Sequence, residues 1–287
     1  RIAAEAAPTT ATAAATPART TLASPTLAMT GDPKEILHDS AVTLCGTKKI
    51  HIDSPVRIFK DQYSTVHMTV SDPGALGWQW TGTSPAFRNT PSGAALDCTS
   101  IMNGNSGNTD PAMFDQKGWI QAFHFDGTTA HAYSHQDYFG TRTSEPGCHD
   151  AGTTDGLPYC WYASIGHWRG TPSAGGAITF AKSAAAPGHG AIYPHVQYPG
   201  HSGTPLAGWI GYGTPSNIIR GRTSTGALDG YSYMFVYTNS GTLGQAKGVC
   251  LFRSADPADG TSWRAWDGST SAPAFICPAV PETSTTT

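Results

Sequence analysis

The chain has 287 residues, enough for one large domain or two small ones. Only 13% of its residues are charged and its net charge is −3, whereas an ordinary soluble protein has about 25% charged residues. The small acidic excess, without any basic run, excludes a general nucleic-acid binder. No run of about 18 apolar residues occurs, so we expect no membrane span. Abundant Gly (33), Pro (21) and aromatic residues (10%) favour an all-β domain with long loops.

The two ends of the chain differ in composition from the middle. Residues 1–36 are rich in Ala, Thr and Pro without hydrophobic periodicity, which predicts a disordered segment, and residues 281–287 predict a disordered tail. The N-terminal composition is typical of the mature start of a secreted protein, so we expect an extracellular protein. The six cysteines include no C-x-x-C spacing and predict disulfides. Cys148 and Cys160 close a short loop and are the expected pair, while the other pairings stay open.

Between the two ends, short apolar or alternating runs predict a series of hairpins. In chain order the candidate strands are 42–45, 50–52, 56–59, 66–70, the hairpin 119–134, 161–168, 178–181, 216–220, 231–237, 248–253, 263–266 and 274–277. Segments 73–117, 141–160 and 183–212 are predicted as loops, the first with a short apolar piece near 96–101. No stretch of ten or more residues has a helical period. Trp263 and Trp266 are expected to be structural, closing the last hairpin.

Repeated hairpins in one domain, residues 37–280, indicate radial repetition. A five-bladed β-propeller buries such hairpins face to face, so we predict this architecture for a catalytic domain. A β-sandwich is the alternative.

The stretch after the central hairpin carries the clearest candidate site. The strand is expected to end near Ser134, and His135, Gln136, Asp137 and Tyr138 follow. His135 and Asp137 share a face, while Tyr138 points to the other face if the strand continues. A carboxylate between a histidine and a tyrosine at a strand end is more typical of a site than of a solvated surface.

Three stretches carry a family resemblance. They are DSPVRIFKD at 53–61, FDG and HQDYFG within 125–140 with CWY at 160–162, and TPSNI, DGY, GVCLFR and SWRAWDG within 214–268. Together they resemble a group of secreted five-bladed propeller proteins, which is itself similar to glycoside hydrolases of families 43, 32 and 117. The resemblance covers most of residues 50–268.

This resemblance implies roles for two aspartates. Asp53 would be the base or nucleophile on the innermost strand of the first blade, and Asp137 would be the general acid or a carboxylate that tunes its neighbours. The chain departs from the family pattern because none of its four Glu residues lies at the end of a candidate inner strand. Glu145, beside the Cys148 loop, is the alternative acid. Apart from the resemblance, Asp53 also fits a turn aspartate that hydrogen-bonds its own backbone.

Four further residues are candidates for substrate binding. Arg57 is expected on the face of Asp53, where it would grip a sugar carboxylate or hydroxyls, or else form a buried ion pair with an acid. Trp161 is a candidate for stacking on a sugar ring, or else a core residue. Asn217 and Gln245 are candidates for binding sugar hydroxyls, or else turn residues.

Three functions follow as hypotheses. The first is a glycoside hydrolase acting on a polysaccharide or oligosaccharide with paired carboxylates, Asp53 and Asp137, whose separation would set a retaining or inverting outcome. The second is a polysaccharide lyase, with His135 and Tyr138 as acid and base and Arg57 neutralising a uronate. The third is a carbohydrate-binding propeller without catalysis. Each candidate motif occurs once rather than in every repeat, which favours one central site and hence an enzyme.

The sequence predicts no cofactor. It contains no H-x-H or H-E-x-x-H spacing, so a zinc site is not expected. Structural calcium held by loop carboxylates stays open. We expect a monomer whose partner is a carbohydrate, with no nucleic-acid or membrane partner.

Overall fold

The computed structural model describes residues 43–44, 48–49, 52–72, 77–83, 94–104, 107–140, 161–193, 209–239 and 248–265. By internal contacts the chain divides into two compact units, Arg1–Glu35 and Ile36–Thr287, and all described residues belong to the second. The disordered ends, the Cys148–Cys160 pair, Glu145 and Gln245 are predictions that fall outside the described residues. Among the described residues, Cys98 and Cys250 each take part in a disulfide. Within the described ranges, no helix is long and apolar enough to cross a membrane.

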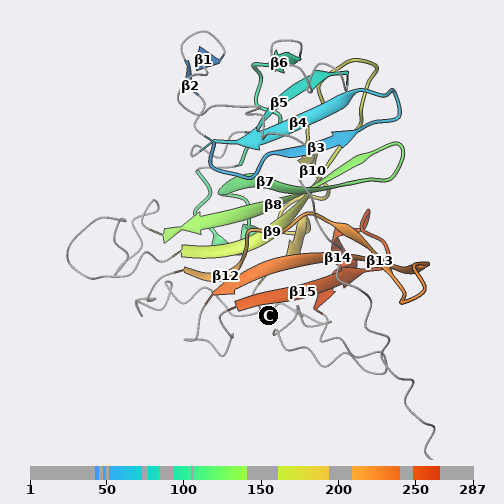
Figure 1. The fold of residues 1–287 in the computed structure, drawn as a ribbon. Coiled ribbons are helices and arrows are strands. Elements are labelled where there is room, and N and C mark those ends of the chain that lie inside the picture. Colours follow the sequence, from blue (N-terminus) through green and yellow to red (C-terminus); the bar gives the residue numbers. More distant parts are fainter. Residues whose placement is uncertain are drawn as a thin grey trace, which may run out of the picture. The chain divides into compact units, whose positions relative to one another are not determined.

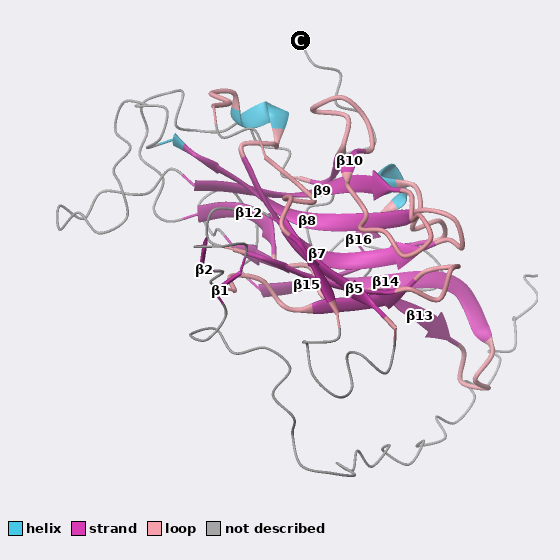
Figure 2. Ribbon diagram, turned by 90° about the horizontal axis from the view of Figure 1, so that it is seen from above, coloured by secondary structure: helices cyan, strands magenta, loops and turns pink. Residues whose placement is uncertain are grey.

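The described residues are almost entirely strands (Figures 1 and 2). The strands are β1 (Thr43–Leu44), β2 (Lys48–Lys49), β3 (Arg57–Lys60), β4 (Val66–Ser71), β5 (Gly77–Gly82), β6 (Ala95–Asp97), β7 (Lys117–Phe125), β8 (Ala130–Phe139), β9 (Trp161–Gly170), β10 (Ala181–Lys182), β11 (Gly190–Ile192), β12 (Trp209–Gly213), β13 (Ile219–Arg222), β14 (Leu228–Asn239), β15 (Gly248–Ser254) and β16 (Arg264–Ala265). Two short 3₁₀ helices, η2 (Pro111–Met113) and η5 (Gly260–Ser262), interrupt them. The all-β prediction is confirmed.

The first sheet is a four-stranded antiparallel meander in the order β3-β4-β5-β6. Its core consists of Met68 and Val70 on β4 with Trp78 and Trp80 on β5. The prediction of a loop over residues 73–117 is therefore wrong for β5 and β6. The run Trp78-Gln79-Trp80-Thr81 does alternate, but it is short and lies among Gly and Pro residues, which favour a loop.

The second sheet has ten strands and follows the path β16-β15-β14-β12-β9-β8-β7. β10 and β11 pair with β9, and β13 pairs with β14. β12 runs parallel to β9, whereas the other pairs are antiparallel. β3 and β4 of the first sheet contact β7 of the second. These pairings do not show closure into blades, so the count of five stays a prediction.

Two loop or strand boundaries after β9 also differ from the prediction. Within the predicted strand 178–181, only Ala181 pairs with β9, as part of β10 (Ala181–Lys182). The rest of that segment is irregular, although Ile178 and Phe180 are buried. β11 and β12 lie within the predicted loop 183–212. Both are short and rich in glycine, which weakens a sequence signal that depends on alternating large side chains.

The strand β8 continues to Phe139 instead of ending near Ser134, so its polar segment is buried between β7 and β9. Gln136 makes this possible because glycines lie beside it on both neighbours. A Cβ on Gly118 or Gly166 would lie 2.7 or 2.8 Å from the Gln136 side-chain amide. The absence of those side chains leaves room for the buried amide. The segment that was expected to end the strand therefore lies in the middle of the sheet.

Both faces of β8 are buried, which hides the alternation that an exposed strand would show. Tyr133 and Ile165 belong to the cluster that includes Trp263 and Phe252. Ala132, on the other face of β8, belongs to a second cluster, with Ile120, Trp168 and Ile178. His131, Tyr133, His135 and Asp137 thus share the face of β8 that looks toward the first of these clusters.

Candidate functional site

His135 and Asp137 form a buried contact near the end of β8. Nε2 of His135 lies 2.7 Å from Oδ1 of Asp137. The indole Nε1 of Trp161 donates to the same carboxylate oxygen at 2.6 Å. The Asp137 side chain is 3% exposed and that of His135 is 11% exposed. The pair that the sequence singled out is therefore brought together, with His135 at the more open position.

Two tryptophans lie beside this pair. The imidazole of His135 is parallel to the Trp161 ring, with an interplanar angle of 5° and a centroid separation of 6.5 Å. The Trp119 ring is tilted against His135 at 5.9 Å. On β12, the strand beyond β9, a Cβ at Gly213 would lie 2.9 Å from the His135 ring. The imidazole thus lies against the β12 backbone, with an indole on each neighbouring strand.

Lys117 is a residue of this site that sequence reasoning missed. It is buried and directly opposite Asp137 in the β7–β8 pairing. Its ammonium lies 5.8 Å from the centroid of the Trp119 ring. The signal was present in the sequence, since Lys117 and Trp119 share a face of the central hairpin. It was not used because the strand was expected to begin only at Trp119.

Asp53 lies in a segment whose contacts lead to the same end of β7. Its backbone N–H donates to the carbonyl of Ser71 at 2.8 Å, which extends the edge of β4. The Ser71 hydroxyl accepts from the Ile120 N–H at 3.0 Å, and the Trp119 indole donates to the Asp72 carbonyl at 2.9 Å. The Asp53 residue itself is exposed. These contacts link the segments of Asp53 and Trp119. That the carboxylates of Asp53 and Asp137 act together in one site stays a prediction.

Arg57 is used within the fold. Its Nε–H donates to the carbonyl of Gln121 and its Nη1 to the carbonyl of Val56. Gln121 is the extra residue of a β-bulge in the β7–β8 ladder, between Ile120 and Ala122, so its carbonyl needs a partner outside that ladder. Burial lowers the pKa of Arg57. Within the described residues its bonds go to these carbonyls, and the expected ion pair with an acid is not formed there.

Three further predicted residues lie within the described part of the chain. Tyr138 is buried on the opposite face of β8, where its hydroxyl donates to the Thr109 carbonyl at 3.0 Å. Asn217 is exposed in the connection between β12 and β13. Trp161 is half-buried, and its indole contacts the pair.

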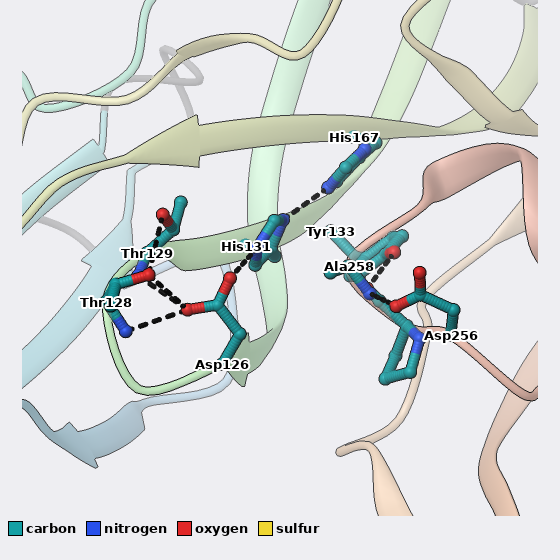
Figure 3. A network of polar contacts seen from close by, with 9 residues as sticks. Asp126, Thr128, Thr129, His131, Tyr133, His167, Asp256 and Ala258 are labelled. Carbon is teal, nitrogen blue, oxygen red and sulfur yellow. Dashed lines mark hydrogen bonds and ion pairs between the residues drawn. The ribbon is translucent and has the colours of Figure 1, made fainter.

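A second polar cluster occupies the opposite end of β8 (Figure 3), and the sequence analysis did not identify it. Nε2 of His131 lies 3.1 Å from Oδ2 of Asp126, and Nδ1 of His131 lies 3.0 Å from Nε2 of His167. The His167 ring stacks on Tyr133 at 5.0 Å, and the Tyr133 hydroxyl donates to the Pro257 carbonyl at 2.7 Å. At roughly 3.3 Å per residue, this cluster lies about 20 Å along the strand from Asp137.

The environment of this second cluster shifts three ionisation equilibria. Burial lowers the pKa of His167 to about 3, and the nearby His131 lowers it further. Burial and Lys182 lower the pKa of His189 to about 4. Desolvation works to raise the pKa of Asp126, but hydrogen bonds from Thr129, Thr128 and His131 outweigh it and lower that pKa. The cluster thus combines a charged carboxylate with neutral imidazoles at neutral pH.

Acid should therefore destabilise the fold. The pKa values of His167 and His189 are depressed from about 6.5 in the unfolded chain, so the unfolded state binds more protons between pH 6.5 and about 4. We expect the free energy of unfolding to decrease as the pH is lowered through this window, by up to about 1.4 kcal/mol per pH unit for each histidine. Urea unfolding at pH 7, 6, 5 and 4 measures the slope. A His189→Gln variant should have a shallower slope, and an unchanged slope would contradict the assignment.

A third histidine network is structural. His67 is fully buried between Oδ2 of Asp61, 3.0 Å away, and Oε1 of Gln79, 3.1 Å away, and its ring stacks on Phe59. Oδ1 of Asp61 also accepts the backbone N–H groups of Tyr63 and Thr65, at 2.9 and 2.8 Å. These contacts hold the β3–β4 turn and leave no ring nitrogen facing solvent.

Comparison with known proteins adds only distant structural similarity. No protein-family model matches the chain, and no curated protein matches it. Among solved structures, the chain is similar to the high-resolution structure of Penicillium chrysogenum alpha-L-arabinanase complexed with arabinobiose, with 9% identity and a TM-score of 0.37. The similarity covers 80% of this chain and 55% of that one, so the chain spans about half of the arabinanase. At that level it assigns no function, and the site is interpreted from its own geometry.

Proposed function

We propose that this protein is a carbohydrate-active enzyme that hydrolyses glycosidic bonds at the His135–Asp137 pair. The observation that carries the proposal is the buried imidazole–carboxylate contact, 2.7 Å long, with Trp119 and Trp161 on its two sides. Indole faces and edges suit the apolar faces of sugar rings. An oriented imidazole beside them supplies a group that can donate or accept a proton at a bound sugar.

The contacts support a specific division of labour. Asp137 already accepts from Trp161 and contacts His135, so it suits the tuning role better than that of a free acid or nucleophile. We assign it the task of orienting His135 and stabilising its protonated form, as a carboxylate does for a catalytic imidazole. His135 then donates its proton to the glycosidic oxygen. The exposed carboxylate of Asp53 takes the proton of the attacking water.

A polysaccharide lyase is the second candidate, and Lys117 is the observation that favours it. A lyase must neutralise the uronate carboxylate while a base removes the neighbouring proton. Arg57 is engaged with main-chain carbonyls, whereas Lys117 lies opposite Asp137 on the strand that carries Trp119. In this scheme Lys117 binds the carboxylate, and His135 removes the C5 proton. The C4–C5 double bond then forms as the C4–O bond breaks, and His135 passes the proton to the departing glycosidic oxygen. Tyr138, on the other face of β8, has no role.

Product analysis distinguishes the two candidates. The purified chain is incubated with neutral polysaccharides and with uronate-containing polysaccharides, and both new reducing ends and the ultraviolet absorbance of unsaturated uronates are measured. A hydrolase releases reducing ends from at least one substrate without the absorbance. Reducing ends that appear together with the absorbance, and only from uronate polymers, identify a lyase. Binding without any product would contradict both and leave a carbohydrate-binding protein.

A further inference from the structure

The second histidine cluster borders a pocket that the proposed function does not use. The pocket has a volume of about 280 Å³ and lies where β9 and the β10–β11 connection meet the segment around η5. The polar residues of its wall are His167, Arg169, Ser183, His189, Asp259 and Thr261. It lies at the Asp126 end of β8, so the inference below does not depend on the role of His135 and Asp137.

The hydrogen bonds of the cluster determine which nitrogen of His167 carries the proton. Asp126 is a charged carboxylate and can only accept, so His131 donates to it through Nε2. In its neutral form His131 then has an unprotonated Nδ1, which accepts from Nε2 of His167. Since burial keeps His167 neutral, with a pKa of about 3, its remaining nitrogen, Nδ1, presents a lone pair.

His167 and Gly260 both line this pocket and lie against each other. A Cβ on Gly260 would lie 2.6 Å from Nδ1, closer than any real contact permits. Only glycine fits beside this nitrogen, at a position where a left-handed backbone is not the reason for glycine. In the described part of the chain no hydrogen bond reaches His167 Nδ1, so the nitrogen can accept one from a ligand.

The rest of the wall is polar and balanced in charge. Burial keeps His189 neutral near pH 7, with its pKa lowered to about 4. Arg169, which donates to the Ser183 carbonyl at 2.9 Å, and Asp259, which accepts from the Thr261 N–H at 2.9 Å, contribute opposite charges. Such a wall offers donors and acceptors without favouring a net charge. A hydroxyl is a donor that suits the lone pair of Nδ1.

We propose that this pocket binds a neutral, hydroxyl-rich molecule of about monosaccharide size, and that Nδ1 of His167 accepts a hydrogen bond from one of its hydroxyl groups. The chain Asp126–His131–His167 holds the acceptor nitrogen unprotonated and correctly oriented. Arg169, His189 and Asp259 bind the remaining hydroxyls. The site takes one small ligand at the end of the sheet opposite to Asp137.

Nuclear magnetic resonance of the full chain, labelled with ¹⁵N at histidine, tests both parts of the proposal. The His167→Gln variant identifies the His167 signals among the 11 histidines of the chain. At pH 7 we expect the neutral Nε2–H tautomer for His167. Glucose, galactose, xylose and arabinose are then added separately, and at least one should shift the Nδ1 signal of His167 in a saturable way. A His167 with its proton on Nδ1, or no shift with any of the four sugars, would overturn the proposal.

A single added methyl group provides the matched variant. Gly260→Ala should place its Cβ against His167 Nδ1 and weaken binding of that sugar about tenfold or more, the size of one lost hydrogen bond. Ala255→Ser adds one atom at an exposed position of the same connection and should bind normally. Thermal unfolding checks that both variants fold. Unchanged binding by a folded Gly260→Ala protein would refute the site, and a shift caused by sodium sulfate but by no sugar would show an anion site instead.

Discussion

Replacing Asp137 by Asn should reduce the turnover number about 100- to 10,000-fold, the range that positioned acid–base groups contribute. The amide keeps the shape of the side chain and one oxygen for the Trp161 indole, but it removes the charge next to Nε2 of His135. His135 then loses the group that orients it and stabilises its protonated form. The turnover number and the Michaelis constant are measured on the substrate found in the product screen. The effect should fall on turnover more than on the Michaelis constant, because Asp137 acts through His135.

Asp229→Asn is the matched control for this variant. The carboxylate of Asp229 also accepts hydrogen bonds, from the Tyr231 N–H and the Tyr233 hydroxyl, but it belongs to β14 at a distant turn. Its replacement should leave activity within about twofold, in keeping with the small effects of surface substitutions. Equal activity losses in the two variants, or full activity of Asp137→Asn, would contradict the assigned role of Asp137.

Replacing Trp263 by Ala should lower the free energy of unfolding by about 3–5 kcal/mol, the usual cost of removing a buried aromatic side chain. Trp263 is fully buried in the cluster that joins β8, β9 and β12 to β14 and β15. Its ring meets Tyr133 edge-on, at 5.6 Å and 83°. The vacated space is enclosed by both halves of the larger sheet and cannot collapse easily. Urea unfolding at pH 7 measures the loss.

Two companion variants test whether this loss comes from the cavity. Trp263→Phe retains most of the buried volume and should cost clearly less than Trp263→Ala. Val249→Ala removes apolar atoms from a side chain that is 66% exposed and should change stability by less than about 0.5 kcal/mol. A loss below about 1 kcal/mol for Trp263→Ala would show that this cluster does not hold the two parts of the sheet together.

The sequence was sufficient for the fold class and for the turn chemistry of the central hairpin. Few charges, many glycines and alternating aromatic runs predict strands, and an Asp-Gly pair such as Asp126-Gly127 is typical of the turn that joins β7 to β8. It was not sufficient for the end of β8. His135 to Tyr138 looks like a strand end because polar residues usually lie outside sheets. Here two glycines on the neighbouring strands make room for Gln136, and that depends on pairing between distant segments.

The candidate site was predictable only in part for the same reason. His135 and Asp137 are two residues apart on one strand, so their contact follows from the period of a strand. Lys117 and Trp119 join them only through the register of the hairpin, which a β-bulge shifts by one residue. The contact of His131 with His167, which are 36 residues apart in the sequence, requires β8 and β9 to pair in this register. Arg57 shows the converse: its type suggested sugar binding, but the bulge carbonyl of Gln121 is its partner.

A crystal structure of Asp137→Asn with an oligosaccharide that the unaltered protein cleaves tests the central claim most directly. We predict that the scissile bond lies within hydrogen-bond reach of His135, with a sugar ring against Trp119 or Trp161 and Asp53 facing the bond from the other side. An oligosaccharide whose scissile bond lies elsewhere, with no sugar in contact with His135, would contradict the assignment of the active site to this pair.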